Sequence, residues 1–512
     1  MKAKHFHILA FFEQLMLDGK AIVFALIGLL AFFHLAWWQW GLSVILWLAF
    51  EIADFAKQKY WLTEHELVLT SGIIHKHWRH LPYQKIQNIH RSQWFFLKPF
   101  RLEKIAVDSA GHGGERANQI KLPVIPSWLT WVLEKKHQQP KWPLDQLLEV
   151  VEKAQREKRY DYDQVMKELA HTTLVFSDYE PAQPDEKDGV DSYQSSVSSL
   201  FLYAVTAPEI LLQFAVAFGF LFRVDHHGEL FSKIFSEMTA FGLLIAIGIV
   251  AAFLVVLFIF NIIKTILLYY GFTLKNEGRY LQIHRGFFET RSLSLAKSRI
   301  QSLQIEQNLW RRFLKMATVR LRIITDKNGD DEVAKRLPTL LPLIKEKRVA
   351  KTVNSFLPDL LPKERVVIRS KGYYQSLIMA RNASCLLLIP LAVLLYFVDN
   401  PFSFLFVLLV LLVAFAAGFY KGRVTGVTQV LDGQVLVLQT ARFFTKKTNY
   451  IPIKAIQSLS LRQSLWLSIR NKRAHVTVLV RSDNGISAIE TRYLPLHEAH
   501  MIYQSYQDGY RK

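Results

Sequence analysis

The chain alternates between long apolar runs and segments in which apolar and polar residues alternate. Apolar runs of near-spanning length come in three pairs, at residues 21–38 with 40–56, about 200–222 with 240–263, and 383–398 with 402–420. About 20 apolar residues cross the hydrocarbon core of a bilayer. Runs such as 241–263 are too long and too apolar for a helix of a soluble protein. The pattern therefore predicts six transmembrane helices, arranged as three hairpins.

Each pair of apolar runs is followed by a segment with the alternating pattern of β-strands. Strands are predicted at Leu67–Thr70, Gly72–His77, Arg79–Tyr83, Leu281–Arg285, Phe287–Leu293, Val319–Thr325, Glu332–Leu337, Val435–Thr440, Phe443–Ile451, Val476–Arg481 and Ser487–Leu494. Asn-Gly pairs at 328–329 and 484–485 are typical of hairpin turns. Helical patterns then follow at Pro126–Lys136, Leu340–Leu357 and Leu496–Tyr506. Each segment thus predicts a small β-sandwich or barrel with a C-terminal helix.

A short motif recurs in these segments: Ile-Gln, an alternating stretch, and a closing Gln seven residues after the Ile. Its three copies are Ile86, Gln87 and Gln93; Ile300, Gln301 and Gln307; and Ile456, Gln457 and Gln463. The pairs Leu81-Pro82, Leu295-Ala296 and Ile451-Pro452 precede the motif at matching offsets, and Leu122-Pro123, Leu337-Pro338 and Leu494-Pro495 follow it. Repetition at fixed spacing indicates three copies of one module, in which these residues have a structural role.

The repeats divide the chain into an alternating series of hairpins and modules. The expected divisions are an N-terminal helix with hairpin 1 (1–56), module 1 (57–137), a charged helix with a flexible linker (138–199), hairpin 2 (200–268), module 2 (269–360), a linker helix with hairpin 3 (361–420) and module 3 (421–512). Within the insertion, 144–173 predicts one charged helix, whereas 177–196, rich in Asp, Pro, Ser and Gln, is typical of a flexible linker.

Charge predicts how the chain is oriented in the membrane. The formal net charge is +20, and nearly all lysines and arginines lie in the modules and at the two termini. Cytoplasmic loops carry such an excess, so the modules and both termini are expected in the cytoplasm. Cys385 is the only cysteine, which excludes an internal disulfide and a cysteine-based metal site. No signal-peptide cleavage pattern follows Met1, so the first apolar run is expected to remain as an anchor.

The order of these features resembles the bacterial membrane-flanked PH-like domain proteins, in particular their large multi-copy YdbT type. The resemblance is carried by the hairpin, Leu62-Thr63, Gly72-Ile73-Ile74, Leu-Pro, Ile-Gln, the closing Gln and the final Leu-Pro, and it covers nearly the whole chain apart from 137–199. It implies a PH-like fold of two packed antiparallel sheets with a helix across one end. It also implies the bacterial inner membrane, no established enzymatic activity, a smaller single-module relative as partner and, for some members, tolerance of membrane-active antimicrobial peptides.

The third copy departs from the pattern of the other two. Arg442 stands where the first and second copies have Gly72 and Gly286. A glycine at this place serves a turn with positive φ, so the arginine predicts a different turn.

Basic residues beside aromatic ones follow the closing Gln in every copy. The candidates for binding the membrane surface or its headgroups are Lys98, Arg101 and Lys104 in module 1, Arg311, Arg312 and Lys315 in module 2, and Arg470, Lys472 and Arg473 in module 3. Such residues suit an anionic membrane surface, at about 1 kcal/mol for each. The structural alternative, in which the aromatics are core and the charges are merely solvated, stays open. Nucleic acid is a poorer alternative, because the membrane already accounts for the basic residues.

One ionisable residue, Glu209, lies inside an apolar run. A charge in the hydrocarbon region is costly and marks a candidate intramembrane site, either inside the helix bundle, for example facing His34, or on a proton or substrate path. Glu51 and Asp54 are closer to a helix end, where ion pairs with Lys57 and Lys59 are expected.

Other chemistry has little support. His75, His77 and His80 have no acidic or cysteine partner nearby in the sequence, so no metal site and no cofactor are expected. No nucleophile elbow, phosphate loop or zinc-protease motif occurs.

We therefore expect a non-enzymatic inner-membrane scaffold whose three cytoplasmic PH-like modules bind partner proteins or anionic lipid headgroups. Its expected partners are the bilayer and a smaller single-module relative, or a second copy through self-association. The alternative is a transporter or lipid-handling protein with a midplane cavity around Glu209. Replacing Glu209 by Gln should impair the transporter alone, whereas neutralising Arg311 and Arg312 should cost the scaffold its partners.

Overall fold

The structure is a computed structural model. It describes residues 4–12, 14, 37–73, 75–109, 119–172, 192–207, 240–323, 338–358, 360–361, 373–397, 401–429, 435–464, 472–482 and 485–511.

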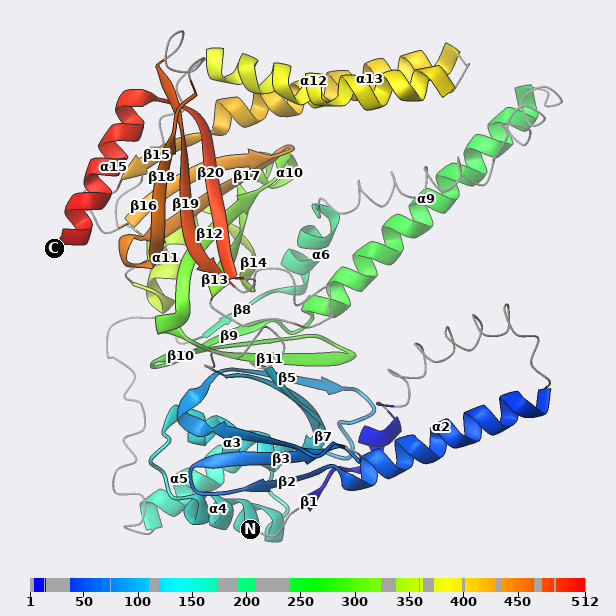
Figure 1. Cartoon of the computed structure of the whole chain (residues 1–512), viewed down its shortest axis with the longest axis vertical. Coiled ribbons are helices and arrows are strands. Elements are labelled where there is room, and N and C mark those ends of the chain that lie inside the picture. The colour runs from blue at the N-terminus through cyan, green and yellow to red at the C-terminus, as the bar shows by residue number, and fades with distance from the viewer. Residues whose placement is uncertain are drawn as a thin grey trace.

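Three modules of one topology follow one another along the chain (Figure 1). Each has three antiparallel strands, then three more, then a helix. Module 1 contains β2 (Lys59–Leu62), β3 (Glu66–Ser71), β4 (His77–Pro82), β5 (Ile86–Trp94), β6 (Leu102–Ser109), β7 (Gln119–Pro126) and α3 (Ser127–Gln138). Module 2 contains β9 (Thr273–Glu277), β10 (Tyr280–Arg285), β11 (Glu289–Ala296), β12 (Ile300–Gln307), α10 (Leu309–Phe313), β13 (Met316–Ile323), β14 (Thr339–Lys345) and α11 (Glu346–Phe356). Module 3 contains β15 (Gly426–Gln429), β16 (Val435–Arg442), β17 (Thr445–Pro452), β18 (Ile456–Arg462), β19 (Arg473–Ser482), β20 (Gly485–Pro495) and α15 (Leu496–Arg511).

Neighbouring modules share their sheets, which the sequence did not predict. β11 of module 2 pairs with β5 of module 1, and β17 of module 3 pairs with β12 of module 2. The result is a seven-stranded sheet, ordered β7-β6-β5-β11-β10-β9-β8, and a six-stranded sheet, ordered β14-β13-β12-β17-β16-β15. The sheets β1-β2-β3-β4 and β18-β19-β20 stand at the two ends. The modules thus form one continuous stack (Figure 1).

Short strands extend the outer edge of two modules. β1 (Lys4–His5) pairs with β2, and β8 (Ser192–Gln194) pairs with β9. The second of these strands lies in the stretch predicted as flexible linker, so that prediction is wrong at its C-terminal end. The part 173–191 lies outside the described residues.

Each module encloses a hydrophobic core of its own, formed by the inward faces of its strands and by its helix. The core of module 1 also includes Leu147 and Val150 of α4 (Leu144–Arg156) and Val165 of α5 (Tyr162–Thr172). The stretch 144–173 was predicted as a single charged helix. It is two helices instead, and their apolar faces belong to module 1.

The repeated Ile-Gln motif marks the same irregularity in all three modules. Ile86, Ile300 and Ile456 are buried. The strand register shifts immediately after each of them, at Ile86/Asn88, Ile300/Ser302 and Ile456/Ser458. The Gln that follows the Ile is therefore the extra residue of a β-bulge, which bends the strand as it leaves the 3-10 turn before it. This assigns the repeat a structural role.

Other boundaries differ from the predicted ones. Residues 72–73 and 75–76 form a turn rather than a strand. Thr339–Lys345 is a strand, whereas the sequence pattern predicted helix from Leu340. The predicted strand at 332–337 lies outside the described residues. The hairpin at Asn484-Gly485 is confirmed, because Ser482 pairs with Gly485. The different turn predicted at Arg442 is confirmed too. Gly72 and Gly286 themselves have positive φ, 96° and 111°, whereas in the third copy the positive φ, 50°, is that of the next residue, Phe443.

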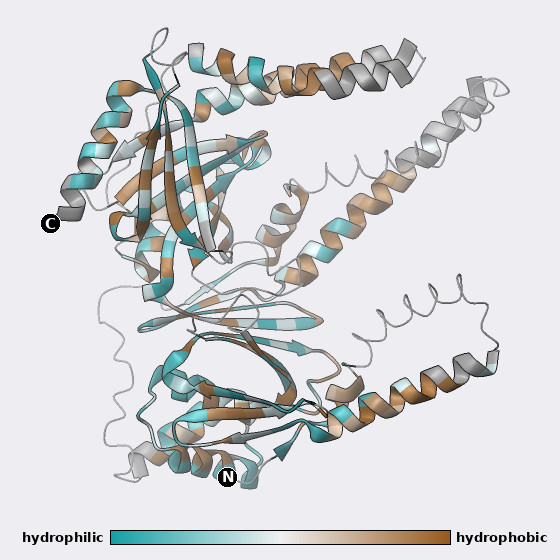
Figure 2. Cartoon of the chain, in the orientation of Figure 1, coloured by the Kyte–Doolittle hydropathy of each residue, from teal (hydrophilic) through white to brown (hydrophobic). Residues whose placement is uncertain are grey.

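Long apolar helices leave the stack on one side (Figures 1 and 2). They are α2 (Trp37–Lys57), α9 (Ala240–Tyr269), α12 (Tyr373–Phe397) and α13 (Pro401–Val424). By length and composition, Ala252–Tyr269 of α9 and Val407–Val424 of α13 suffice to cross a membrane. None of the first window is buried, so α9 is not the core helix of a soluble domain.

The described residues thus support two of the six predicted spans. Residues 15–36 and 208–239, which include further predicted spans, lie outside the described residues.

Candidate membrane interface

Two loops between strands expose large apolar side chains. We call residues 94–101 of module 1 and 308–315 of module 2 the junction loops. Phe95 and Phe100 are 55% and 63% exposed in the first loop, and Trp310 and Phe313 are 67% and 83% exposed in the second. Soluble surfaces rarely expose contiguous apolar patches of this kind, which mark interaction sites. The alternative prediction from the sequence, that the aromatic residues after the closing Gln belong to the core, is therefore wrong for Phe95, Phe100, Trp310 and Phe313.

The closing Gln of the repeat fixes the shape of each junction loop. The side-chain amide of Gln93 donates to the carbonyl oxygen of Leu102 at 3.1 Å, and that of Gln307 donates to the carbonyl oxygen of Met316 at 3.1 Å. Just before these acceptors, Arg101 and Lys315 adopt positive φ, 55° and 53°. The same bond across the same turn explains the repeated spacing from Ile to Gln. The two loops therefore end in the same turn, although the second contains helix α10 and the first contains no helix.

Each junction loop lies against a turn of the next module. This contact is beside the end of an apolar helix that joins the module. The rings of Phe95 and Phe288 have centroids 5.9 Å apart, and the N–H of Phe95 donates to the carbonyl of Phe288 at 2.7 Å. Phe287 in turn packs on Tyr270, just past the end of α9, with centroids 5.1 Å apart. The second loop repeats this arrangement less tightly. Arg312 donates to the hydroxyl of Tyr420 on α13 at 3.5 Å, and the Tyr420 ring lies 6.0 Å from that of Phe444. Aromatic residues at the end of a spanning helix are typical of the membrane interface.

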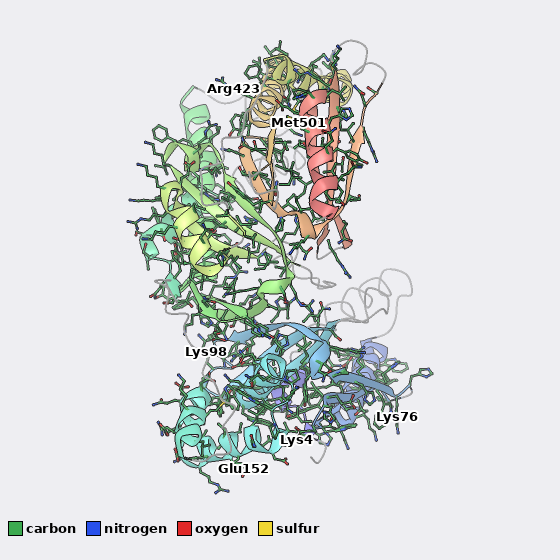
Figure 3. All side chains as sticks on the ribbon, turned by 90° about the vertical axis from the view of Figure 1, so that its left-hand side faces the viewer. Lys4, Lys76, Lys98, Glu152, Arg423 and Met501 are labelled. Carbon is green, nitrogen blue, oxygen red and sulfur yellow. The ribbon has the colours of Figure 1, made fainter. Side chains whose placement is uncertain are left out.

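Four of the nine predicted basic residues are exposed on the junction loops, and a fifth is exposed in module 3. Lys98, Arg101, Arg312, Lys315 and Lys472 are exposed. Lys98 lies level with the joint between modules 1 and 2 (Figure 3). Arg101 also stacks over the ring of Tyr160.

Three other candidates contribute less to an exposed surface. Lys104 is half-buried. Arg473 is half-buried and donates to the carbonyl of Tyr493 at 2.7 Å. Arg470 lies outside the described residues.

Arg311 is not a surface residue, which corrects its prediction as a headgroup ligand. It is 4% exposed, and its guanidinium donates to the hydroxyls of Thr206 and Thr318 at 3.0 and 2.8 Å and to the carbonyl of Tyr203 at 3.2 Å. Tyr203 and Thr206 end α6 (Val197–Val205), the helix that leads into the second apolar pair. A cation suits the negative end of a helix. Arg311 therefore anchors the entry to hairpin 2 on module 2.

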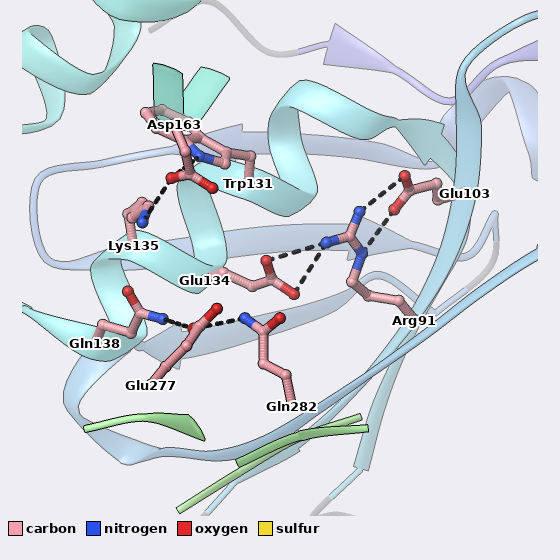
Figure 4. A network of polar contacts seen from close by, with 9 residues as sticks. All are labelled: Arg91, Glu103, Trp131, Glu134, Lys135, Gln138, Asp163, Glu277 and Gln282. Atoms are coloured by element: carbon pink, nitrogen blue, oxygen red, sulfur yellow. Dashed lines mark hydrogen bonds and ion pairs between the residues drawn. The ribbon is translucent and has the colours of Figure 1, made fainter. Parts of the chain in front are cut away.

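A polar network joins module 1 to module 2 (Figure 4). Arg91 on β5 donates to Glu103 at 3.0 Å and to Glu134 of α3 at 3.1 Å. Gln138 at the end of α3 donates to Glu277 of module 2 at 3.2 Å. Beside this network a polar cleft of about 330 Å³ is lined by Arg91, Gln93, Glu103, Thr273, Lys275, Gln282, His284, Thr290 and Ser292. No sequence pattern predicts this network, because bonded partners such as Gln138 and Glu277 are 139 residues apart.

Burial shapes the charges of this network. It opposes the charged form of Arg91, but Glu134 and Glu103 outweigh it and raise the pKa of Arg91. Burial raises the pKa of Glu134 and that of Glu277. Burial, together with the positive charge of Arg91, lowers the pKa of His284. The triad of Arg91, Glu103 and Glu134 thus favours one compensated cation–carboxylate arrangement within module 1. The bond from Gln138 to Glu277 joins module 1 to module 2.

The remaining candidates contribute little to the interface. His80 has an acidic partner after all, because its Nδ1 lies 2.9 Å from a carboxylate oxygen of Glu66 on the neighbouring strand. Among the described residues no group of three His, Cys, Asp or Glu side chains is placed to hold a metal ion. Asp54 accepts a hydrogen bond from Gln58 at 2.9 Å rather than pairing with a lysine. Glu209 and His34 lie outside the described residues, so the intramembrane site remains a prediction.

Comparison with known proteins agrees with the repeat. A family model described as bacterial PH domain matches the chain three times, at residues 9–132, 234–355 and 385–509. A relative from Bacillus subtilis (strain 168), the UPF0699 transmembrane protein YdbT, is 23% identical over 480 residues, which cover 90% of this chain and 88% of the relative. No solved structure matches the chain. Each of the three family matches spans the main strands of one module and at least half of its final helix.

Proposed function

The chain belongs to the bacterial PH domain family, and on that premise we propose that it is a non-enzymatic scaffold of the bacterial inner membrane. Its three PH-like modules and both termini would lie in the cytoplasm, with six helices spanning the membrane in three hairpins. The modules would bind anionic lipid headgroups or partner proteins and help the envelope withstand membrane-active agents. The relative's description as a transmembrane protein supports the membrane location.

One observation carries this proposal: the exposed aromatic and basic side chains of the junction loops gather at the feet of the apolar helices. Phe313 and Trp310 would enter the headgroup region, and Arg312 and Lys315 would lie beside lipid phosphates. Each basic residue near an anionic surface contributes about 1 kcal/mol. Because the sheets are continuous from module to module, the two loops are held on one side of a single rigid row.

The test is the environment of Phe313 in a membrane. The full chain, with Cys385→Ser and Phe313→Cys, is labelled with an environment-sensitive fluorophore and placed in nanodiscs of phosphatidylcholine alone or mixed with phosphatidylglycerol. We expect a blue shift of the emission, larger with the anionic lipid. A label at Glu152→Cys, on exposed α4, should show neither effect.

A matched pair of charge variants isolates the basic residues. Arg312→Gln with Lys315→Asn should abolish the extra shift caused by the anionic lipid; asparagine tolerates the positive φ at position 315. Lys347→Gln with Lys351→Gln removes the same charge from the exposed face of α11 and should leave the shift intact. A label at position 313 that remains fully aqueous in both lipids would refute the proposal.

A further inference from the structure

The two internal joints of the stack use one and the same strand register. Gln93 of β5 lies opposite Thr290 of β11, and Gln307 of β12 lies opposite Lys446 of β17. In both joints, the closing Gln of one module faces a residue of the third main strand, β11 or β17, of the next module. That residue lies six positions before the strand ends, at Ala296 in β11 and at Pro452 in β17. The joint is thus a repeated unit, made by one kind of strand from each side.

Each joint is formed by two kinds of strand, and each kind occurs once more at an end of the stack. There, the edge that would form a joint is not paired with another described strand. β18 corresponds to β5 and β12, and β4 corresponds to β11 and β17. In the described part of the chain, β18 pairs only with β19, and β4 pairs only with β3. Lys76, next to β4, lies in the module at one end of the stack, and Met501 of α15 lies in the module at the other (Figure 3).

Exposure supports this reading of the ends. Ser294 and Asn449, within the internal joints, are 3% exposed each, whereas His80 and Arg79 at their places on β4 are exposed. Arg462 on β18 is exposed, while Glu306 at its place in β12 is buried. Ser458 is half-buried, while Ser302 at its place is buried. An exposed sheet edge presents backbone N–H and C=O groups that another strand can pair with.

We propose that β18 of one copy pairs with β4 of a second copy, so that the chain associates head to tail in the membrane. Continuing the internal register places Leu459 opposite His80, Ser460 opposite Arg79, and Leu461 opposite Trp78. A contact between two different surfaces of the same chain builds an open row, unless the rotation between successive copies closes it into a ring. The apolar helices all leave one side of the stack (Figure 1), so added copies could keep theirs in the same membrane.

Charge makes this joint weaker than the internal ones. Glu306 of β12 lies 3.0 Å from Lys447 of β17 in the second internal joint, and Glu289 contributes a carboxylate to the first. The proposed joint has no carboxylate on either strand and brings Arg462 opposite His77. Charge therefore makes the association reversible and dependent on the high local concentration that a membrane provides.

The experiment is a crosslink between two differently tagged full-length chains, coexpressed in membranes in the Cys385→Ser background. One chain carries Ser460→Cys and the other Arg79→Cys. Mild oxidation should give a disulfide dimer of the two tags. The control replaces Arg79→Cys by Trp78→Cys, one position out of register, where the side chains point to opposite faces of the sheet. It should give little dimer. Both changes in the test pair lie at surface positions and leave the internal joints intact.

A gain-of-association variant makes the test specific to the joint. Arg462→Glu places a carboxylate where Glu306 stands in the internal joint, and it should raise the crosslink yield about two- to fivefold. Arg481→Glu, an exposed change on β19 of the same sheet, should not.

The inference is overturned by equal yields in and out of register, by no dimer at all, or by a Ser460→Cys adduct that contains only another protein. Because this inference extends the scaffold proposal, the label at position 313 separates the two: a preserved lipid response without crosslinks refutes self-association alone.

Discussion

Replacing Arg311 by Met is expected to release α6 from module 2 without removing any exposed charge from the junction loop. The guanidinium of Arg311 makes three buried hydrogen bonds, to Thr206, Thr318 and Tyr203. Hydrogen bonds to a charged group contribute about 1.5–3 kcal/mol each. In the variant, the hydroxyls of Thr206 and Thr318 can still donate to acceptors of their own. The sum of the three hydrogen-bond energies therefore overstates the stability that the substitution removes. A net cost of about 3 kcal/mol follows, or about a hundredfold in the local opening equilibrium.

The assay is amide hydrogen exchange of the full chain in nanodiscs, followed by mass spectrometry of peptides covering Val197–Val205. The variant Arg311→Met should lower protection there by about a hundredfold while the strands of module 1 stay protected. Arg312→Met is the matched control, because this neighbour is exposed and its guanidinium donates a 3.5 Å hydrogen bond to the hydroxyl of Tyr420. Unchanged protection in Arg311→Met, together with a lost response to anionic lipid, would show that Arg311 binds headgroups and would refute the anchoring role.

Three further predictions concern buried groups. Burial and the charge of Arg299 lower the pKa of His137 to about 4 in the folded chain. As the pH falls from about 6.5 to 4, the unfolded chain therefore binds more protons than the folded chain, and the free energy of unfolding should drop by about 3 kcal/mol. His137→Phe should flatten this part of the profile of melting temperature against pH. Lys136→Met, which leaves Glu64 without its 2.9 Å partner, should destabilise module 1 by about 2 kcal/mol in denaturant titrations, and a stability equal to the parent would contradict the pairing. Gly418→Val should separate α12 from α13, since a Cβ at Gly418 would lie 2.6 Å from the carbonyl oxygen of Met379; spin-label distances between the helices should broaden, but not in Gly248→Val, where nothing lies within 4 Å.

The parts of the fold that the sequence predicts well are those fixed by neighbours along the chain. Ile86 is buried by the alternation of its own strand, and Gln93 bonds across a turn only nine residues long. Such local requirements repeat at constant spacing in every copy. The same holds for the helix after the last strand of modules 1 and 3. In module 2 the pattern predicts helix from Leu340, whereas α11 begins at Glu346.

The parts that the sequence does not predict depend on partners far away in the chain. Arg311 lies in a basic and aromatic stretch, which indicates a surface. Its partners Thr206 and Tyr203, more than 100 residues earlier, make it a buried anchor. The strand pairing of Leu293 with His90 has no signature in either strand, because backbone hydrogen bonds carry no sequence information. The charges of 144–173 predict a solvent-exposed helix outside the modules. Its apolar residues, such as Leu147 and Val150, instead pack into the core of module 1.

The modules differ most where they meet another strand, and this difference bears on assembly. In the internal joint, Glu306 faces Lys447 at 3.0 Å and is nearly buried. The equivalent place on the open edge of β18 holds Arg462, and β4 presents Arg79 and two histidines to solvent. Like charges on an open edge oppose uncontrolled pairing. Backbone geometry thus permits a further joint at each end, and side-chain charge sets its strength below that of the joints within the chain. A single carboxylate at position 462 is therefore enough to test whether charge, rather than shape, limits the length of the row.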